Sequence, residues 1–142
     1  MADDISDFTR SMGIATSGLR AQAGRMRVIS ENIANAESTS QAAGGDPYRR
    51  KIPTFTSELD RSLDARVVGL GRVRPDMAST FRVKYEPGSP AADAAGNVKY
   101  PNVNSLIEMT DMKEAQRSYE ANLNIISATR RMIQRTLDIL KA

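Results

Sequence analysis

The feature that most constrains the fold of this 142-residue chain is the distribution of proline. All 6 Pro lie between Pro47 and Pro101, and residues 40–102 also hold 6 of the 9 Gly, whereas residues 1–39 and 103–142 contain no Pro. Proline interrupts helices because it lacks an amide donor and its ring clashes with the preceding turn. Clusters of Pro and Gly mark turns. The sequence therefore predicts two long terminal helices around a turn-rich centre.

Apolar residues in the N-terminal segment recur at alternating steps of three and four. This period is typical of a coiled-coil seam, in which a narrow apolar stripe faces a partner helix. Gln22 is the single polar member. We predict that the large apolar members mediate subunit packing. The stripe consists of Ile5, Phe8, Met12, Ala15, Leu19, Gln22, Met26, Ile29, Ile33 and Ala36.

The C-terminal segment repeats this spacing, with two polar interruptions at Gln116 and Arg130. Ser105, followed three residues later by Glu108, fits a capping box, so we expect Ser105 to be the N-cap of this helix. The apolar members are again predicted to mediate subunit packing, and Ile125, Met132 and Ile139 widen the stripe. The stripe consists of Met109, Met112, Gln116, Tyr119, Leu123, Ile126, Arg130, Ile133, Leu137 and Leu140.

Three glycines fall inside the N-terminal helical segment. Gly13, Gly18 and Gly24 each cost roughly 1 kcal/mol relative to alanine, which is large beside the marginal stability of an isolated helix. We therefore expect this helix to become ordered only when its apolar stripe is packed. Because both flanks carry such a stripe, the two helices can cover each other or contact neighbouring subunits.

The predicted fold is mainly α, with two long helices packed as a coiled-coil-like hairpin and a central irregular or small β segment. We expect an N-terminal helix within residues 1–39, a loop and β segment at 40–102, and a C-terminal helix within 103–142, all in one structural unit.

The central segment offers candidate strands. Phe81, Val83 and Tyr85 alternate with basic residues, as in a half-buried strand. Residues 66–68 and 72–74 are candidate partner strands for it. The sequence thus predicts a small β element in the centre.

The composition argues against an enzyme. The chain contains no Cys and no His, which removes thiolate nucleophiles, cysteine metal sites, the usual general base and the commonest metal ligand. No catalytic residue, metal site, cofactor site or small-molecule substrate is predicted. The 20 basic and 17 acidic residues are interleaved along the chain, which favours solvated faces over a nucleic-acid surface.

The sequence shows neither a membrane-spanning segment nor an ordinary secretory signal. No apolar run approaches the ~20 residues that span a bilayer, so no insertion into a lipid membrane is expected. The first residues include Asp3, Asp4 and Asp7, whereas a secretory signal peptide begins with basic residues. These ordinary signals alone predict a cytoplasmic protein.

Two patches of small and polar residues are not explained by a generic coiled coil. Near the N-terminus, Ser17-Gly18-Leu19 is followed by Glu31-Asn32-Ile33-Ala34-Asn35-Ala36, with Thr39 shortly after. Near the C-terminus, Asn102-Val103-Asn104 is followed by Ala115-Gln116-Arg117-Ser118-Tyr119-Glu120-Ala121-Asn122. In these patches the chain resembles the rod and hook axial proteins of the bacterial flagellum. The residues that carry the family motif are Gly18, Leu19, Asn32, Ile33, Ala34, Asn35, Asn102, Asn104, Tyr119, Ala121 and Asn122.

The resemblance extends to the short C-type subunits of the proximal rod. It covers nearly the whole chain and includes Pro47-Tyr48-Arg49-Arg50-Lys51, Tyr85-Glu86-Pro87-Gly88-Ser89-Pro90 and Tyr100-Pro101-Asn102-Val103-Asn104. Two local departures are Glu37-Ser38-Thr39, where the family often has Asn-Thr, and Ser89, where it often has His. Neither departure falls on the apolar stripes.

The resemblance implies a structural subunit that assembles helically into the hollow shaft of the proximal rod, which surrounds the export channel and transmits motor torque. It implies, as partners, other copies of the chain, other rod proteins, the junction of the rod base with the MS ring, and the flagellar type III export apparatus. The implied location is the basal body, where the rod crosses the periplasm after export without a cleaved signal peptide. The heptads alone also permit a cytoplasmic coiled-coil adaptor or chaperone.

Overall fold

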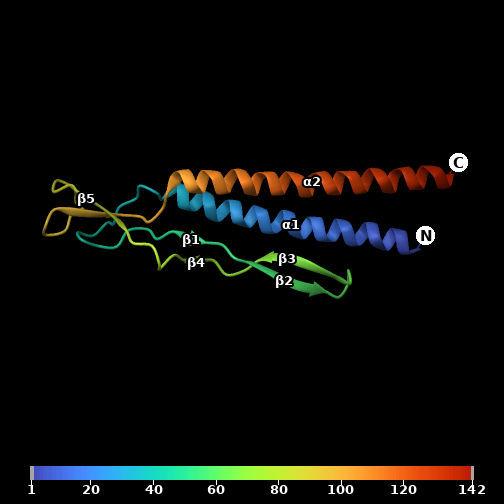
Figure 1. Cartoon of the computed structure of the whole chain (residues 1–142), viewed down its shortest axis with the longest axis horizontal. Coiled ribbons are helices and arrows are strands. Elements are labelled where there is room, and N and C mark those ends of the chain that lie inside the picture. The colour runs from blue at the N-terminus through green and yellow to red at the C-terminus, as the bar shows by residue number, and fades with distance from the viewer. Residues whose placement is uncertain (1, 142) are drawn as a thin grey trace. The chain divides into compact units, whose positions relative to one another are not determined.

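Two long helices flank the centre of the chain. The computed structural model describes residues 2–141, and side chains are described for residues 6–139. Helix α1 comprises Ala2–Ala34 and helix α2 comprises Ser105–Lys141 (Figure 1). Beyond α1 the chain tightens into two turns, in which Ala36 N–H donates to Ile33 O and Ser38 N–H donates to Asn35 O. The predicted pair of terminal helices is confirmed.

The start of α2 differs from the predicted capping box. Asn104, and not Ser105, is the N-cap, because Asn104 Oδ1 accepts a hydrogen bond from Leu106 N–H at 3.0 Å. This amide is one of the first four in a helix, which have no partner within the helix. Ser105 is consequently the first helical residue. Glu108 makes its side-chain contacts away from the cap, as described below.

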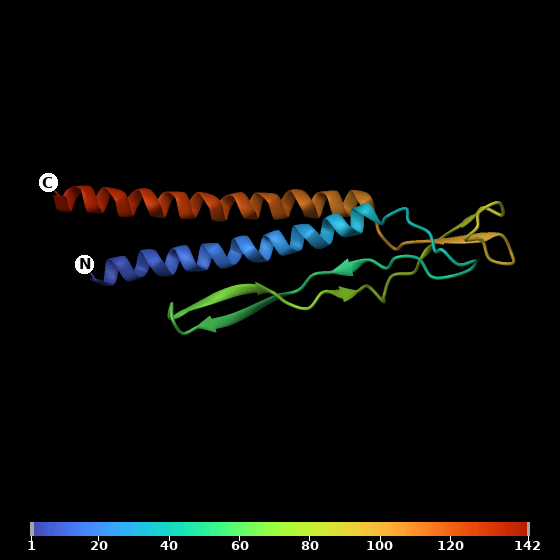
Figure 2. The ribbon, with the colours of Figure 1, turned by 180° about the vertical axis from the view of Figure 1, so that it is seen from behind.

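The central segment forms three two-stranded antiparallel sheets among the described residues. Each sheet is a β-ribbon formed by two strands of the central segment (Figures 1 and 2). The pairs are β1 (Lys51–Ile52) with β4 (Arg74–Pro75), β2 (Phe55–Asp60) with β3 (Ala65–Leu70), and β5 (Arg82–Tyr85) with β6 (Asn97–Tyr100). The predicted small β element is confirmed, and it is larger than expected.

The predicted strand pairing was wrong. β5 pairs with β6, with Arg82 opposite Tyr100, and not with residues 66–68 or 72–74. Gly96, which adopts a φ of +81°, lies in the connection that returns the chain to β6. Glycine enters this left-handed region without the strain that a Cβ imposes. Residues 66–68 instead belong to β3 and pair with β2, a strand that was not predicted from the sequence.

The chain divides into two compact units. Unit 1 comprises Met1–Met26, Thr54–Arg72 and Glu114–Ala142, and unit 2 comprises Arg27–Pro53 and Val73–Lys113. Each helix therefore contributes one part to each unit. Both units join segments that are far apart in the sequence.

In unit 1, the glycines of α1 lie where other elements approach the helix closely. A Cβ at Gly18 would lie 2.8 Å from Asn122 Nδ2 of α2, and one at Gly24 would lie 2.8 Å from Leu70 Cδ2. A Cβ at Gly13 would meet Leu63 in the turn between β2 and β3. The glycines thus cost helix propensity but provide the room in which α2 and the β2–β3 hairpin pack.

Polar contacts strengthen the packing of the hairpin on α1 in unit 1. Arg10 Nε donates to Leu63 O at 2.9 Å, and the Val68 amide donates to Ser17 Oγ at 3.2 Å. On the α2 side, Arg25 Nη2 lies 3.6 Å from Glu114 Oε2.

Unit 2 has its own small core. Its most buried apolar side chains include Val98, Val103, Val28 and Ile29. Arg82 ties β5 to this core, because its guanidinium donates to Ala36 O at 2.9 Å and to Pro101 O at 3.3 Å.

Within the part of the chain that the structure describes, neither helix is sufficiently long and apolar to cross a membrane.

Candidate functional site

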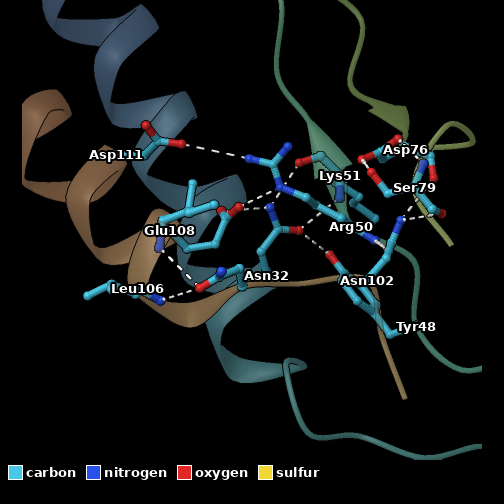
Figure 3. Close-up of polar contacts among 12 residues, drawn as sticks. Asn32, Tyr48, Arg50, Lys51, Asp76, Ser79, Asn102, Leu106, Glu108 and Asp111 are labelled. Carbon is cyan, nitrogen blue, oxygen red and sulfur yellow. Dashed lines mark hydrogen bonds and ion pairs between the residues drawn. The ribbon is translucent and has the colours of Figure 1, made fainter. Parts of the chain in front are cut away.

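A polar cluster lies in unit 2, where the end of α1 meets the start of α2 (Figure 3). We define it by Asn32, Tyr48, Arg50, Asn102 and Glu108. Asn32 comes from α1 and Glu108 from α2, whereas Tyr48 and Arg50 lie just before β1 and Asn102 lies between β6 and α2. Asn32 and Glu108 are each only 1% exposed. Polar groups so deeply buried are tolerated only when they have hydrogen-bond partners.

Asn32 uses the whole hydrogen-bonding capacity of its amide. Its Nδ2 donates to Lys51 O at 2.9 Å and to Glu108 Oε2 at 3.0 Å. Its Oδ1 accepts from Lys51 N–H and from the Tyr48 hydroxyl, both at 2.9 Å. Asparagine offers two donors and two acceptor sites on its side chain. Asn32 thus links α1, the Tyr48 segment and α2.

Glu108 is paired with a cation as well as with Asn32. Arg50 Nε donates to Glu108 Oε1 at 2.6 Å, and Arg50 Nη2 lies 3.7 Å from Asp111 Oδ2 on the next turn of α2. A buried carboxylate needs such compensation because removing it from water is costly.

Asn102 extends the cluster toward the loop after β4. Its Oδ1 accepts from the Arg50 amide at 2.8 Å, and its Nδ2 donates to Asp76 O at 3.1 Å and Ser79 O at 3.2 Å. The Ser79 hydroxyl, which donates to Asp76 Oδ2 at 2.7 Å, holds the pKa of Asp76 below its ordinary value. The cluster therefore joins both helices, β1 and this loop through hydrogen bonds.

Tyr48 makes the cluster sensitive to alkaline pH. Its burial, and then the negative charges of Glu31 and Glu108, raise the pKa of Tyr48 to about 12. Because the folded pKa lies above the ordinary value of 10, the neutral hydroxyl stabilises the fold fully below pH 10. That contribution is lost as the pH rises through 12.

We expect Tyr48→Phe to lower the free energy of unfolding by about 1 kcal/mol at pH 8, because it removes the hydrogen bond to Asn32. As the pH rises above 10, the difference between wild type and Tyr48→Phe should shrink and then reverse sign, because only the wild type must keep a partly buried hydroxyl protonated in order to fold. Urea unfolding of both proteins between pH 8 and 12 measures this difference in the free energy of unfolding. A difference that stays constant with pH contradicts the assignment.

The structure brings several predicted motif residues together and separates others. Asn32 and Asn102 belong to the polar cluster, Asn104 caps α2, and Gly18 faces Asn122 across unit 1. Leu19, Ile33, Asn35 and Tyr119 are half-buried, and Ala34 and Ala121 are exposed.

Sequence reasoning missed Tyr48, Arg50 and Glu108 as cluster members. The basic triplet Arg49-Arg50-Lys51 gave no sign of which cation faces inward, because no periodic structure surrounds it. For Glu108 the sequence predicts only a place in a helix cap.

The innermost side chains of α2 are small or polar and do not coincide with the predicted stripe. Glu108, Ala115 and Thr129 are buried and Asn122 is half-buried. They lie seven residues apart, and we call these four residues the inner stripe of α2. Met109, Leu123 and Leu137 of the predicted stripe lie beside it and remain exposed.

The other predicted packing residues have intermediate positions. Ile29 is buried, and the half-buried members are Phe8, Met12, Leu19, Met26, Ile33, Met112, Tyr119, Ile126 and Ile133. The side chains of Ile5 and Leu140 lie outside the described part of the chain. The proposed contact of all these residues with other subunits stays a prediction.

No metal centre accompanies these surfaces in the described part of the chain, where no three His, Cys, Asp or Glu side chains gather in a way that could hold an ion.

Comparison with known families assigns the class of protein. Residues 12–40 match the family described as Flagella basal body rod protein, and residues 94–139 match Flagellar basal body rod FlgEFG protein C-terminal. The two matches contain parts of both long helices and all of the motif residues. They define a flagellar basal-body rod protein.

Whole-chain relatives narrow the class. The chain is 54% identical over 129 residues to the flagellar basal-body rod protein FlgC of Agrobacterium fabrum, covering 91% of this chain and 92% of the relative. It is 35% identical over 138 residues to FlgC of Aquifex aeolicus (96% and 100% covered) and 37% identical over 126 residues to FlgC of Salmonella typhimurium (89% and 92% covered). The chain therefore belongs to the FlgC family of flagellar basal-body rod proteins. It is a structural rod subunit and not an enzyme, which sets aside the adaptor or chaperone alternative.

Proposed function

We propose that this chain is a subunit of the proximal rod, and that copies assemble helically into a hollow drive shaft that surrounds the export channel and transmits motor torque. The inner stripe of α2 carries this proposal. Its side chains are small or polar, whereas large apolar side chains on both sides of it, such as Leu123 and Ile125, remain exposed. Large exposed apolar surfaces mark interaction sites. A helix with an apolar flank on each side of its intramolecular contact is suited to neighbours on both sides.

We further propose that α1 and α2 pack as a coiled-coil-like hairpin. The close approach of Gly18 and Asn122 supports it, as does the Arg25–Glu114 ion pair. Small residues let helix backbones come close, and interlocked side chains then resist sliding. A rigid pair of helices is what an element that transmits torque requires.

The location and partners follow from the family and remain part of the proposal. The subunit passes through the flagellar type III export apparatus without a cleaved signal peptide and joins the rod where it crosses the periplasm. Its neighbours are other copies of itself, other rod proteins and the junction between the rod base and the MS ring. An interface that uses two different surfaces produces an open helical assembly when the rotation between copies does not close a ring, and a shaft requires such an assembly.

Deletion of the gene tests the proposed function directly. A deletion strain should not swim, its isolated basal bodies should lack a complete rod, and the wild-type chain should restore both. Normal basal bodies and swimming in the deletion strain would contradict the proposal.

A point variant tests the apolar flank of α2. Leu123 is 42% exposed in the subunit, so Leu123→Asp should leave the subunit folded, as measured by far-UV circular dichroism. If Leu123 is buried by a neighbouring subunit, the buried, unpaired carboxylate costs several kcal/mol. Since each 1.4 kcal/mol is tenfold in affinity, incorporation into basal bodies should fall by at least about 100-fold, and swimming should be lost.

Asn124→Asp is the matched control, because Asn124 is the exposed neighbour of Leu123 on α2 and gains the same charge. Cells with Asn124→Asp should swim normally. Normal incorporation of Leu123→Asp into basal bodies would show that this flank faces solvent in the rod.

A further inference from the structure

The outer edge of β2 pairs with no further strand in the described part of the chain. The Gly71 amide donates to Thr54 O at 2.7 Å, which fixes which residues of the β2–β3 hairpin exchange hydrogen bonds. In an antiparallel pair these alternate with residues whose amide and carbonyl point away from the partner strand. The outward-pointing backbone groups of β2 are therefore those of Phe55, Ser57 and Leu59, and all three residues are exposed.

β5 has a second edge of the same kind. The Glu86 amide donates to Gly96 O at 2.9 Å, so by the same alternation the backbone groups of Val83 and Tyr85 point away from β6. All four residues of β5 are exposed. Among the described residues, neither edge pairs with a further strand.

The two edges are complementary in side chains as well. On β2 the residues alternate between an apolar face with Phe55 and Leu59 and an acidic face with Glu58 and Asp60. On β5 they alternate between an apolar face with Val83 and Tyr85 and a basic face with Arg82 and Lys84. Residues that lie opposite each other in a sheet share a face. Leu59 near the end of β2 and Val83 on β5 are both 60% exposed and lie on the apolar faces of the two edges.

An antiparallel register exists in which outward-pointing backbone groups of the two strands meet and oppositely charged side chains lie opposite each other. Placing Leu59 opposite Val83 joins two outward-pointing backbone positions, and it sets Glu58 opposite Lys84. Glu58 and Lys84 take part in no salt bridge among the described residues. The same register sets Asp60 opposite Arg82, which already have partners in their own chain.

We propose that β2 of one subunit pairs antiparallel with β5 of a second copy, which joins two hairpins into a four-stranded sheet between subunits. This rests on the proposed function, since it describes one contact of the rod assembly. The two edges belong to the same chain, so a second copy supplies the missing partner for each. The contact uses different surfaces on the two copies, so it can continue from copy to copy, and it gives an open helix when the rotation between copies does not close a ring. It also covers exposed edges that otherwise promote uncontrolled aggregation.

Disulfide cross-linking tests the pairing cleanly because the chain has no native Cys. A deletion strain would express Leu59→Cys and Val83→Cys together, as separate chains with different epitope tags. Opposed residues of an antiparallel pair lie about 5.5 Å apart at Cα, which is within the range that a disulfide spans. We expect mild oxidation of isolated basal bodies to yield a dimer that carries both tags.

The matched control replaces Val83→Cys by Ala94→Cys, which is also exposed in unit 2 but lies outside β5. It should give at least about tenfold less mixed dimer, because a disulfide requires close and oriented Cβ atoms. Equal cross-linking in test and control would overturn the inference. So would a disulfide from Leu59→Cys to a different rod protein, or absence of the dimer from basal bodies that contain both chains.

A charge exchange provides a second readout. Glu58→Lys alone should reduce the swimming radius at least about twofold, because like charges then face each other. Adding Lys84→Glu to the same chain should restore it, since every copy then carries both reversed charges. Failure of restoration, with both chains folded and incorporated, would contradict the strand pairing. Swimming of the cysteine strains would meanwhile show that the proposed rod function stands independently.

Discussion

Replacing Glu108 by alanine is expected to lower the free energy of unfolding by about 3 kcal/mol, the low end of the range for breaking a buried ion pair. The variant leaves Asn32 Nδ2 without one of its two acceptors and Arg50 without its closest carboxylate. Arg50 is 24% exposed, so water compensates part of the loss. Urea unfolding followed by circular dichroism measures the change, and amide exchange in residues 27–53 should increase because the cluster anchors that segment.

Two further variants separate the cluster from a general effect on α2. Glu114→Ala removes a carboxylate from the same helix, but Glu114 is 66% exposed and its ion pair with Arg25 is long at 3.6 Å. Its loss should cost less than about 1 kcal/mol. Glu108→Gln keeps the shape and one acceptor, so it should fall between the two. If Glu108→Ala and Glu114→Ala cost the same, the polar cluster does not stabilise unit 2.

Replacing Gly18 by valine is expected to destabilise unit 1 by about 1–3 kcal/mol, the usual cost of forcing atoms into a packed contact, and to abolish swimming. A Cβ at this position would lie 2.8 Å from Asn122 Nδ2 and 3.0 Å from Asn122 Oδ1. The larger side chain must displace Asn122 or separate the two helices. Thermal unfolding and swimming assays measure the two effects.

A compensating substitution tests the cause. Gly18→Ala alone should be destabilising, but in the background of Asn122→Ala the clash is absent and alanine should gain roughly 1 kcal/mol of helix propensity over glycine. The sign of the Gly18→Ala effect should therefore reverse. Gly88→Ala serves as the control for glycine replacement without a contact, since nothing lies within 4 Å of its added Cβ. No reversal would mean that Asn122 does not limit the space at Gly18.

The helices were predictable because their signals are local. The absence of Pro from both flanks and the repeating apolar positions depend only on neighbouring residues, and α1 and α2 indeed fill those flanks. The strand at 82–85 was predictable for the same reason. Its partner was not, because pairing depends on the long connection that ends near Gly96 and returns the chain to β6.

The sequence by itself determined the two long helices, the turn-rich centre and the resemblance to flagellar rod proteins. Only the tertiary structure decided which face of each helix lies inside the subunit. The large apolar residues dominate the heptad pattern, yet Leu123 stays exposed while Gly18, Ala115 and Thr129 are buried. Small side chains permit the closest approach of backbones, whereas large ones can equally be covered by another subunit. A periodic apolar pattern indicates that one face of a helix is covered. Whether another element of the same chain or another subunit covers that face depends on packing in three dimensions.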